Sequence, residues 1–192
     1  MKLYLVRHGQ SESNANHRFS GWAQISLTEK GFEDARRAGE YLKKLSFDRV
    51  YSSDLRRAIQ TAQTAIPGCE PLQLPLLREN NVGSLQDHSV AEMEMRYGPR
   101  FWVVPTGADF TAFGGENHDM VRKRVRAFLK MLEEDPCECA VAFAHEGVLR
   151  CMADLVLGMG FNRHHLRCPN AAIAVFSFIN GEWVMEGWNV GA

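Results

Sequence analysis

Residues 2–14, K-L-Y-L-V-R-H-G-Q-S-E-S-N, decide how the rest of the chain is interpreted. Residues 3–6 are a run of apolar strand formers, too short for a globular helix and typical of a strand buried on both faces. Arg7, His8 and Gly9 follow at its carboxyl end, where open α/β sheets bind their ligands. Arg7 offers a planar donor fork that suits phosphate, and His8 is a potential neutral nucleophile because an unperturbed imidazole has a pKa of ~6.5. The stretch predicts an anion site; a strand end with an ordinary surface Arg and His is the alternative.

The composition is that of an ordinary globular protein. The chain has 192 residues, 45% of them hydrophobic and 23% charged, with a formal net charge of −1. A chain of this size buries ~70% of its unfolded surface, so we expect residues 1–192 to form one domain. The balanced charge offers no general footprint for nucleic acid, so any anion site must be local. No apolar run approaches ~18 residues and no signal-peptide pattern is seen, so we expect a cytoplasmic protein without a membrane partner.

The cysteines give no sign of a disulfide framework. There are five of them, and an odd number without dense spacing favours free thiols in a reducing compartment. Cys137 and Cys139 are a near pair, but no second Cys/His pair at zinc spacing accompanies them. Buried or incidental thiols are therefore the preferred interpretation, and we expect no metal site.

Periodicity, caps and turn signals predict strands alternating with helices. We expect strands at 49–52, 71–76, 139–144 and 172–179, the last joined through a type I′ turn at Asn180-Gly181 to a strand at 182–186. We expect helices at 28–45, from Ser53 or Asp54 to 65, and at 90–97, 117–134 and 148–158. In the helix at 117–134 an apolar stripe should be buried (Val121, Val125, Phe128, Leu129, Leu132) and a basic set should be mostly solvated (Arg122, Lys123, Arg124, Arg126). Residues 98–115 should be irregular, either as a lid or as a small hydrophobic cluster.

Three further segments carry residues suited to chemistry. Arg56 and Arg57 stand in the first turn of a predicted helix, where cations oppose the positive helix end unless an anion is present. His145 ends the strand at 139–144 and precedes a helix N-terminus, whose N–H groups can bind an anion. Glu79 lies in a polar loop four residues before Gly83. An exposed basic turn and a solvated carboxylate are the ordinary alternatives for Arg57 and Glu79.

Six segments together resemble the histidine phosphatase superfamily, in its phosphoglycerate-mutase-like branch and, within it, the alpha-ribazole and broad-specificity phosphatase type. They are L-V-R-H-G-Q-S-E-S-N at 5–14, S-G-W-A-Q-I-S-L-T-E-K-G at 20–31, S-S-D-L-R-R-A-I-Q-T-A at 52–62, L-R-E-N-N-V-G at 77–83, G-G-E-N at 114–117 and A-H-E-G-V-L-R at 144–150. The chain departs from the family pattern at Glu146, where Gly is usual. Ser11 stands where the acid phosphatase branch has a second Arg, which argues against that branch.

The resemblance implies a three-layer α/β/α sandwich with a mostly parallel central sheet and an antiparallel edge. It further implies that His8 becomes phosphorylated, that His145 is a second catalytic residue, and that Glu79 carries the proton. Phosphate would be held by Arg7, Asn14, Gly21 and Arg57, whereas Arg56 would lie on the surface. Nothing in this scheme requires a cofactor or a metal.

The expected activity is that of a phosphatase, hydrolysing a phosphomonoester of a small metabolite through phosphohistidine at His8. One alternative is a mutase that returns the phosphate to a sugar-acid hydroxyl, and another is a non-catalytic phosphate-binding regulatory protein. The mutase is less favoured because the segment between Glu79 and His145 is short compared with cofactor-dependent mutases. The binding protein is less favoured because His8, Glu79 and His145 are all present. We expect a monomer or homodimer.

Overall fold

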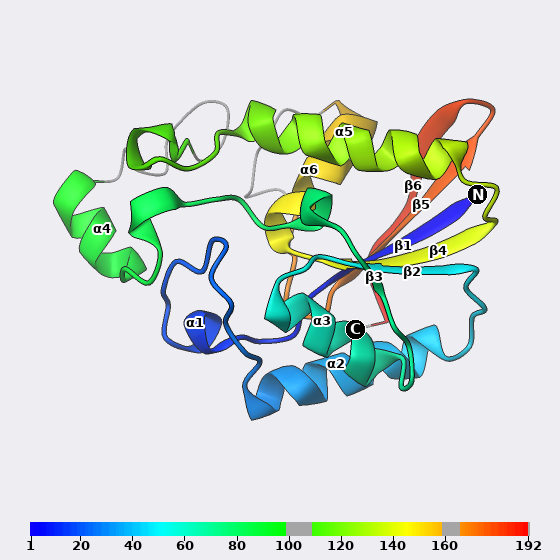
Figure 1. The fold of residues 1–192 in the computed structure, drawn as a ribbon, viewed down its shortest axis with the longest axis horizontal. Coiled ribbons are helices and arrows are strands. Elements are labelled where there is room, and N and C mark those ends of the chain that lie inside the picture. Colours follow the sequence, from blue (N-terminus) through cyan, green and yellow to red (C-terminus); the bar gives the residue numbers. More distant parts are fainter. Residues whose placement is uncertain (99–108, 159–165, 192) are drawn as a thin grey trace.

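The computed structural model describes residues 1–98, 109–158 and 166–191, which form a sheet covered by helices on both faces (Figure 1). The strands are β1 (Lys2–Arg7), β2 (Arg49–Ser52), β3 (Leu72–Gln73), β4 (Cys139–Ala144), β5 (Ile173–Ile179) and β6 (Glu182–Val190). The α-helices are α1 (Glu12–Ala15), α2 (Glu29–Leu42), α3 (Arg56–Ala65), α4 (Val90–Tyr97), α5 (His118–Glu134) and α6 (Glu146–Leu157). Short 3₁₀ turns are η1 (Pro75–Leu77), η2 (Gly83–Leu85) and η4 (Thr111–Phe113).

The sheet order is β3-β2-β4-β1-β5-β6, and the first four of these strands are parallel. β5 pairs antiparallel with β1, and β6 antiparallel with β5, so the predicted mostly parallel sheet with an antiparallel edge is confirmed. In the register of β1 with β4, Arg7 stands opposite Ala144. The residues that follow, His8 and His145, therefore leave adjacent strands at the same edge of the sheet.

Side chains of the central strands alternate between two hydrophobic layers, as they must when helices cover both faces. Tyr4 and Val6 pack with residues of α2 and α3. Leu3 and Leu5 belong to the other layer, with the buried stripe predicted for α5 and with residues of α6. In Figure 1 these two helix pairs lie on opposite sides of the sheet, which confirms the three-layer arrangement.

The segment that follows β1 lies in close contact with the first turn of α2. Thr28 caps that helix, its hydroxyl accepting a hydrogen bond from the Gly31 amide at 3.1 Å, as its position predicted. A Cβ atom built on Gly9 would lie only 2.2 Å from the Gly31 carbonyl oxygen. Gly9 is thus required by a close approach of two backbones, which fixes the chain directly after His8.

Several predicted boundaries were wrong for identifiable reasons. The predicted capping by Ser53 or Asp54 does not occur, because α3 begins at Arg56 with Leu55 as an N-cap that has no side-chain hydrogen bond. Asp54 instead accepts a hydrogen bond from Arg78 at 2.7 Å. The predicted strand at 71–76 shrinks to β3, since η1 begins at Pro75, and β6 runs to Val190 rather than to residue 186.

The segment predicted as irregular is described only in part, because residues 99–108 lie outside the described residues. Its described end supports the hydrophobic-cluster alternative. Phe110 is buried and packs with Phe19, Val82, Leu85 and Met93.

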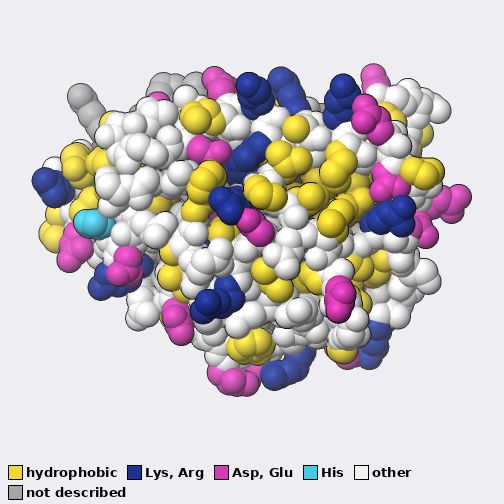
Figure 2. Space-filling view, in the orientation of Figure 1, with side chains coloured by type: hydrophobic (Ala, Val, Ile, Leu, Met, Phe, Trp, Pro, Cys, Tyr) yellow, Lys and Arg dark blue, Asp and Glu magenta, His cyan; other side chains and the backbone are white. Residues whose placement is uncertain are grey.

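The surface carries charges of both signs. On the face in Figure 2, Lys and Arg side chains are interspersed with Asp and Glu, in keeping with a net charge of −1. In the described ranges, no helix is long and apolar enough to cross a membrane.

Candidate active site

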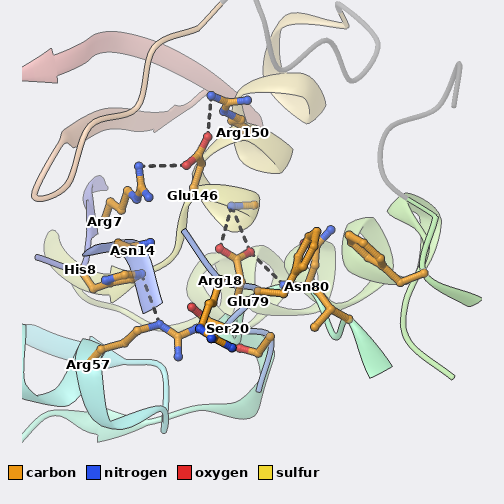
Figure 3. Close-up of a pocket in the computed structure, with 15 residues that line it drawn as sticks. Arg7, His8, Asn14, Arg18, Ser20, Arg57, Glu79, Asn80, Glu146 and Arg150 are labelled. Carbon is orange, nitrogen blue, oxygen red and sulfur yellow. Dashed lines mark hydrogen bonds and ion pairs between the residues drawn. The ribbon is translucent and has the colours of Figure 1, made fainter. Parts of the chain in front are cut away.

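A cavity of about 260 Å³ opens at the ends of β1 and β4. Six of the predicted site residues line it, namely Arg7, His8, Asn14, Gly21, Arg57 and Glu79. Its other lining residues are Arg18, Phe19, Ser20, Asn80, Val82, Phe110, Glu146, Gly147 and Arg150. The structure therefore brings into one cavity side chains that are far apart in the sequence (Figure 3).

The hydrogen bonds of His8 fix the chemical character of its ring. Nδ1 lies 2.6 Å from the Gly9 carbonyl oxygen, which can only accept, so Nδ1 carries the proton. Nε2 then holds the lone pair, toward which Arg57 Nε donates at 3.3 Å. Burial, and next Arg57 and Arg7, lower the pKa of His8 well below its usual value. His8 is therefore a neutral imidazole whose Nε2 is the nucleophilic atom.

Arg57 is fully buried in the cavity wall, so the exposed-turn alternative was wrong, whereas Arg56 is exposed as predicted. Besides contacting His8, its guanidinium donates to the Ala23 carbonyl at 3.0 Å and to the Gly21 carbonyl at 2.9 Å. Burial lowers the pKa of Arg57 to about 10, so it is still a cation at neutral pH. Gly21 thus contributes by holding this cation in place with its carbonyl.

His145 lies directly beside His8, with ring centroids 5.1 Å apart. It is fully buried, and neither ring nitrogen has a hydrogen-bond partner among the described residues. Burial, followed by Arg57 and His8, lowers the pKa of His145 well below its usual value. A buried polar ring without a partner is costly, which indicates that a bound group completes its hydrogen bonding.

Asn14 is held by its carbonyl oxygen. That oxygen accepts hydrogen bonds from the Ser11 amide at 3.1 Å, the Ser11 hydroxyl at 3.0 Å and Asn170 Nδ2 at 3.2 Å. The side-chain NH₂ of Asn14 is left as the group that can donate into the cavity. Asn170 also donates to the His8 carbonyl at 3.2 Å, so it ties the two site segments together.

Glu79 differs from the solvated loop carboxylate that was its alternative. Its Oε1 accepts hydrogen bonds from the Asn80 amide at 2.9 Å and from the Gly147 amide at 3.2 Å. Burial raises the pKa of Glu79 above its usual value, although the Asn80 hydrogen bond and Arg57 act the other way. The first turn of α6, expected to face a substrate anion, thus gives one amide to Glu79 instead. A raised pKa favours the protonated carboxyl group, which is the form that can donate a proton.

Arg124 is a site residue that the sequence did not reveal. Predicted to be solvated on α5, its side chain is only 12% exposed and pairs with Glu116 at 3.0 Å. It also donates to the Glu79 carbonyl at 3.1 Å, and Trp22 Nε1 donates to the same carbonyl at 2.8 Å. These two side chains fix the backbone that carries Glu79.

Glu146 and Arg150, both on α6, also line the cavity unpredicted. Glu146 forms ion pairs with Arg7 at 2.9 Å and with Arg150 at 2.6 Å. The spacing of four residues between Glu146 and Arg150 in a predicted helix could have indicated their pairing.

The fixed charges of the cavity suit an anion, because four arginines line it against two glutamates. No group of three or more His, Cys, Asp or Glu side chains suited to a metal ion occurs among the described residues. Each of the five cysteines, all within the described ranges, is a free thiol.

Comparison with known proteins places the whole chain in one family. The family model of the histidine phosphatase superfamily (branch 1) matches residues 3–191. A protein of Salmonella paratyphi A named probable phosphoglycerate mutase GpmB is 30% identical over 195 residues, covering 99% of this chain and 91% of its own.

Several solved structures that resemble this one are named as phosphatases. A candidate alpha-ribazole-5′-P phosphatase from Escherichia coli superposes with a TM-score of 0.87 at 26% identity, covering 100% of this chain and 97% of its own. A mycobacterial glucosyl-3-phosphoglycerate phosphatase gives 0.85 at 27%, with 98% of each chain covered. Phosphoserine phosphatase from Entamoeba histolytica, in complex with 3-phosphoglyceric acid, gives 0.82 at 26%, covering 98% and 96%. With a fold, a cavity and a family model that agree, this chain belongs to the histidine phosphatase superfamily, branch 1.

Proposed function

We propose that the protein hydrolyses a phosphomonoester of a small metabolite through a phosphohistidine on His8, without a metal ion. The observation that supports this most strongly is the state of the His8 ring. Its Nδ1–H donates to the Gly9 carbonyl, and its unprotonated Nε2 lies in a cavity lined by guanidinium groups. A neutral nucleophile next to fixed cations is what attack on a phosphate anion requires.

In the first step Nε2 of His8 attacks phosphorus in line, forming an N–P bond as the P–O bond to the leaving group breaks. The charge on the phosphoryl oxygens is neutralised by Arg7 and Arg57, and the NH₂ of Asn14 donates a hydrogen bond to them. His145 completes its own hydrogen bonding with the phosphoryl group. Glu79 gives its proton to the leaving oxygen, so that an alcohol departs. The raised pKa of Glu79 favours the protonated carboxyl group, which is the form that this step requires.

In the second step the ionised Glu79 takes a proton from water, whose oxygen attacks the phosphohistidine. The N–P bond breaks, inorganic phosphate leaves, and His8 returns to the neutral form with Nδ1 protonated. The hydrogen bonds from Asn80 and Gly147 stabilise Glu79 as an anion in this half of the cycle. One carboxyl group thus serves both steps.

The cavity indicates a small substrate with a partly apolar leaving group. Its volume of about 260 Å³ can hold a phosphate together with a small organic group. The wall formed by Phe19, Val82 and Phe110 is apolar, while Ser20 and Asn80 supply polar contacts. These features support a phosphorylated metabolite rather than a protein or nucleic acid as substrate. We infer a cytoplasmic enzyme, monomeric or homodimeric.

Phosphoglycerate mutase is the second candidate, because a relative that is 30% identical to this chain carries the name probable phosphoglycerate mutase. The experiment that decides is a panel of phosphorylated metabolites, scored separately for released phosphate and for isomerised product. The panel includes phosphoserine, 3-phosphoglycerate, glucosyl-3-phosphoglycerate and alpha-ribazole phosphate. Phosphate release without isomerisation supports the proposal. Isomerised phosphoglycerate without net release would establish the mutase instead.

A further inference from the structure

The cavity contains a carboxylate that the proposed mechanism does not use. Glu146 bridges two guanidinium groups, with Oε2 2.9 Å from Arg7 and Oε1 2.6 Å from Arg150 (Figure 3). The two arginine side chains are each 13% exposed and that of Glu146 is 32% exposed, so the bridge lies at the cavity wall rather than on the open surface.

The bridge engages the cation on which phosphate binding depends. The same Arg7 nitrogen that pairs with Glu146 also donates to the Cys168 carbonyl, and the buried Nε of Arg7 has no partner among the described residues. A phosphate that arrives at Arg7 must either replace the Glu146 carboxylate or bind beside it. Both groups are anions, and two like charges that contact the same guanidinium repel each other in a partly buried site.

Arg150 can keep the Glu146 carboxylate paired after phosphate has displaced it from Arg7. It stands one helical turn after Glu146, at the spacing where such pairs form, and its Nε is buried and also lacks a partner among the described residues. Glu146 can therefore release Arg7 while it stays paired with Arg150. The helix N-terminus, where Glu146 is the first residue of α6, stabilises its negative charge further.

We propose that Glu146 is an internal counter-ion of Arg7 that competes with phosphate and so weakens the binding of the inorganic phosphate product. Glu146 is thus a positioning residue: it acts through Arg7 and exchanges no proton with the substrate. This inference rests on the proposed function, because it assumes that Arg7 binds phosphate. It predicts an enzyme that releases its product more readily than the same cavity would without this carboxylate.

Calorimetric titration with inorganic phosphate tests the proposal without requiring turnover. We expect Glu146→Gln to bind phosphate about tenfold more tightly than the wild type, equivalent to 1.4 kcal/mol. The matched control is Glu29→Gln, which alters an exposed Glu at the same position of another helix, α2, and should leave the affinity unchanged. Glu146→Ala should act like Glu146→Gln, because both remove the charge. In turnover, phosphate should become a stronger product inhibitor, with KM lowered more than kcat is changed.

A second substitution separates competition from a general charge effect. Arg150→Met should weaken phosphate binding in the wild type, because Glu146 then has only Arg7 to pair with. The same change should have little effect in Glu146→Gln, where there is no carboxylate to redirect. An equal loss in both backgrounds would overturn the proposal and make Arg150 a direct phosphate ligand.

The remaining outcomes are equally decisive. Unchanged or weaker phosphate affinity in Glu146→Gln would overturn the inference while leaving the proposed function intact. A wild type and variants that all fail to bind phosphate would reject both the inference and the phosphate site of the proposed function.

Discussion

Replacing Glu79 by Gln is the sharpest test of proton transfer, because the structure indicates that the variant will keep its geometry. Glu79 Oε1 accepts both backbone hydrogen bonds, from Asn80 at 2.9 Å and from Gly147 at 3.2 Å. A Gln side chain can place its amide oxygen at the same point and retain both. The variant also removes a half-buried carboxyl group, whose ionised form is disfavoured by desolvation. We therefore expect normal folding and near-normal binding of phosphate.

The expected loss is in the chemical step. A positioned acid or base contributes about 10²–10⁴-fold, equivalent to roughly 3–5 kcal/mol of transition-state stabilisation. An alkyl phosphate has a poor leaving group that needs the proton, so kcat/KM for it should fall by this amount. A nitrophenyl phosphate has a good leaving group and should lose much less, provided that phosphorylation of His8 limits the rate.

The assay compares both substrates in wild type and Glu79→Gln, with rapid quenching to follow phosphohistidine. If hydrolysis of phosphohistidine limits the rate, both substrates should slow alike and the phosphorylated enzyme should accumulate. Wild-type rates with both substrates would refute Glu79 as the proton carrier. Glu146 would then be the next acid to test.

Three further predictions concern the histidines, Gly147 and metals. Because the pKa values of His8 and His145 are lowered, the unfolded chain takes up protons near pH ~6.5 that the folded protein does not, so the free energy of unfolding should fall as the pH decreases through this value. In His145→Gln, the free energy of unfolding measured by urea denaturation should depend less steeply on pH. An unchanged pH dependence would contradict this prediction. A Cβ at Gly147 would lie 2.3 Å from Glu79 Oε1, so Gly147→Ala should displace Glu79 and lower kcat/KM for an alkyl phosphate on the order of 10²-fold. The same substitution should add little loss in Glu79→Gln, and additive losses would show that Gly147 does not act through Glu79. Activity should survive exhaustive dialysis against a chelator, and loss restored by Mg²⁺ or Zn²⁺ would disprove a metal-free mechanism.

The sequence was a good guide wherever a local pattern determines the outcome. The strand ends before His8 and His145 could be predicted because apolar runs stop there, and parallel pairing then brings the two rings together. Capping signals and helical spacing likewise predicted the cap at Thr28, the helix α4 and the buried apolar stripe of α5. The family resemblance added what spacing could not, namely that Arg57 rather than Arg56 belongs to the site, where the structure places it in the cavity wall beside His8.

The sequence was a poor guide where a side chain finds its partner in a distant loop. Helical spacing puts Arg124 on the polar side of α5, but the loop that carries Glu79 folds over it and supplies backbone carbonyls as acceptors. Asp54 looked like a helix cap, yet Arg78 provides a charged partner at 2.7 Å. The pairing of Glu146 with Arg7 likewise depends on the sheet register, which no local pattern reveals.

The covalent intermediate is the most direct test of the central claim. Enzyme quenched with base during turnover of a labelled phosphomonoester should carry an alkali-stable, acid-labile phosphate. Mapping should locate it on Nε2 of His8, because Nδ1 is protonated and bonded to the Gly9 carbonyl. His8→Ala should carry none. Phosphate found on Ser11 or Ser13, or turnover with no phosphorylated enzyme at any quench time, would contradict the account.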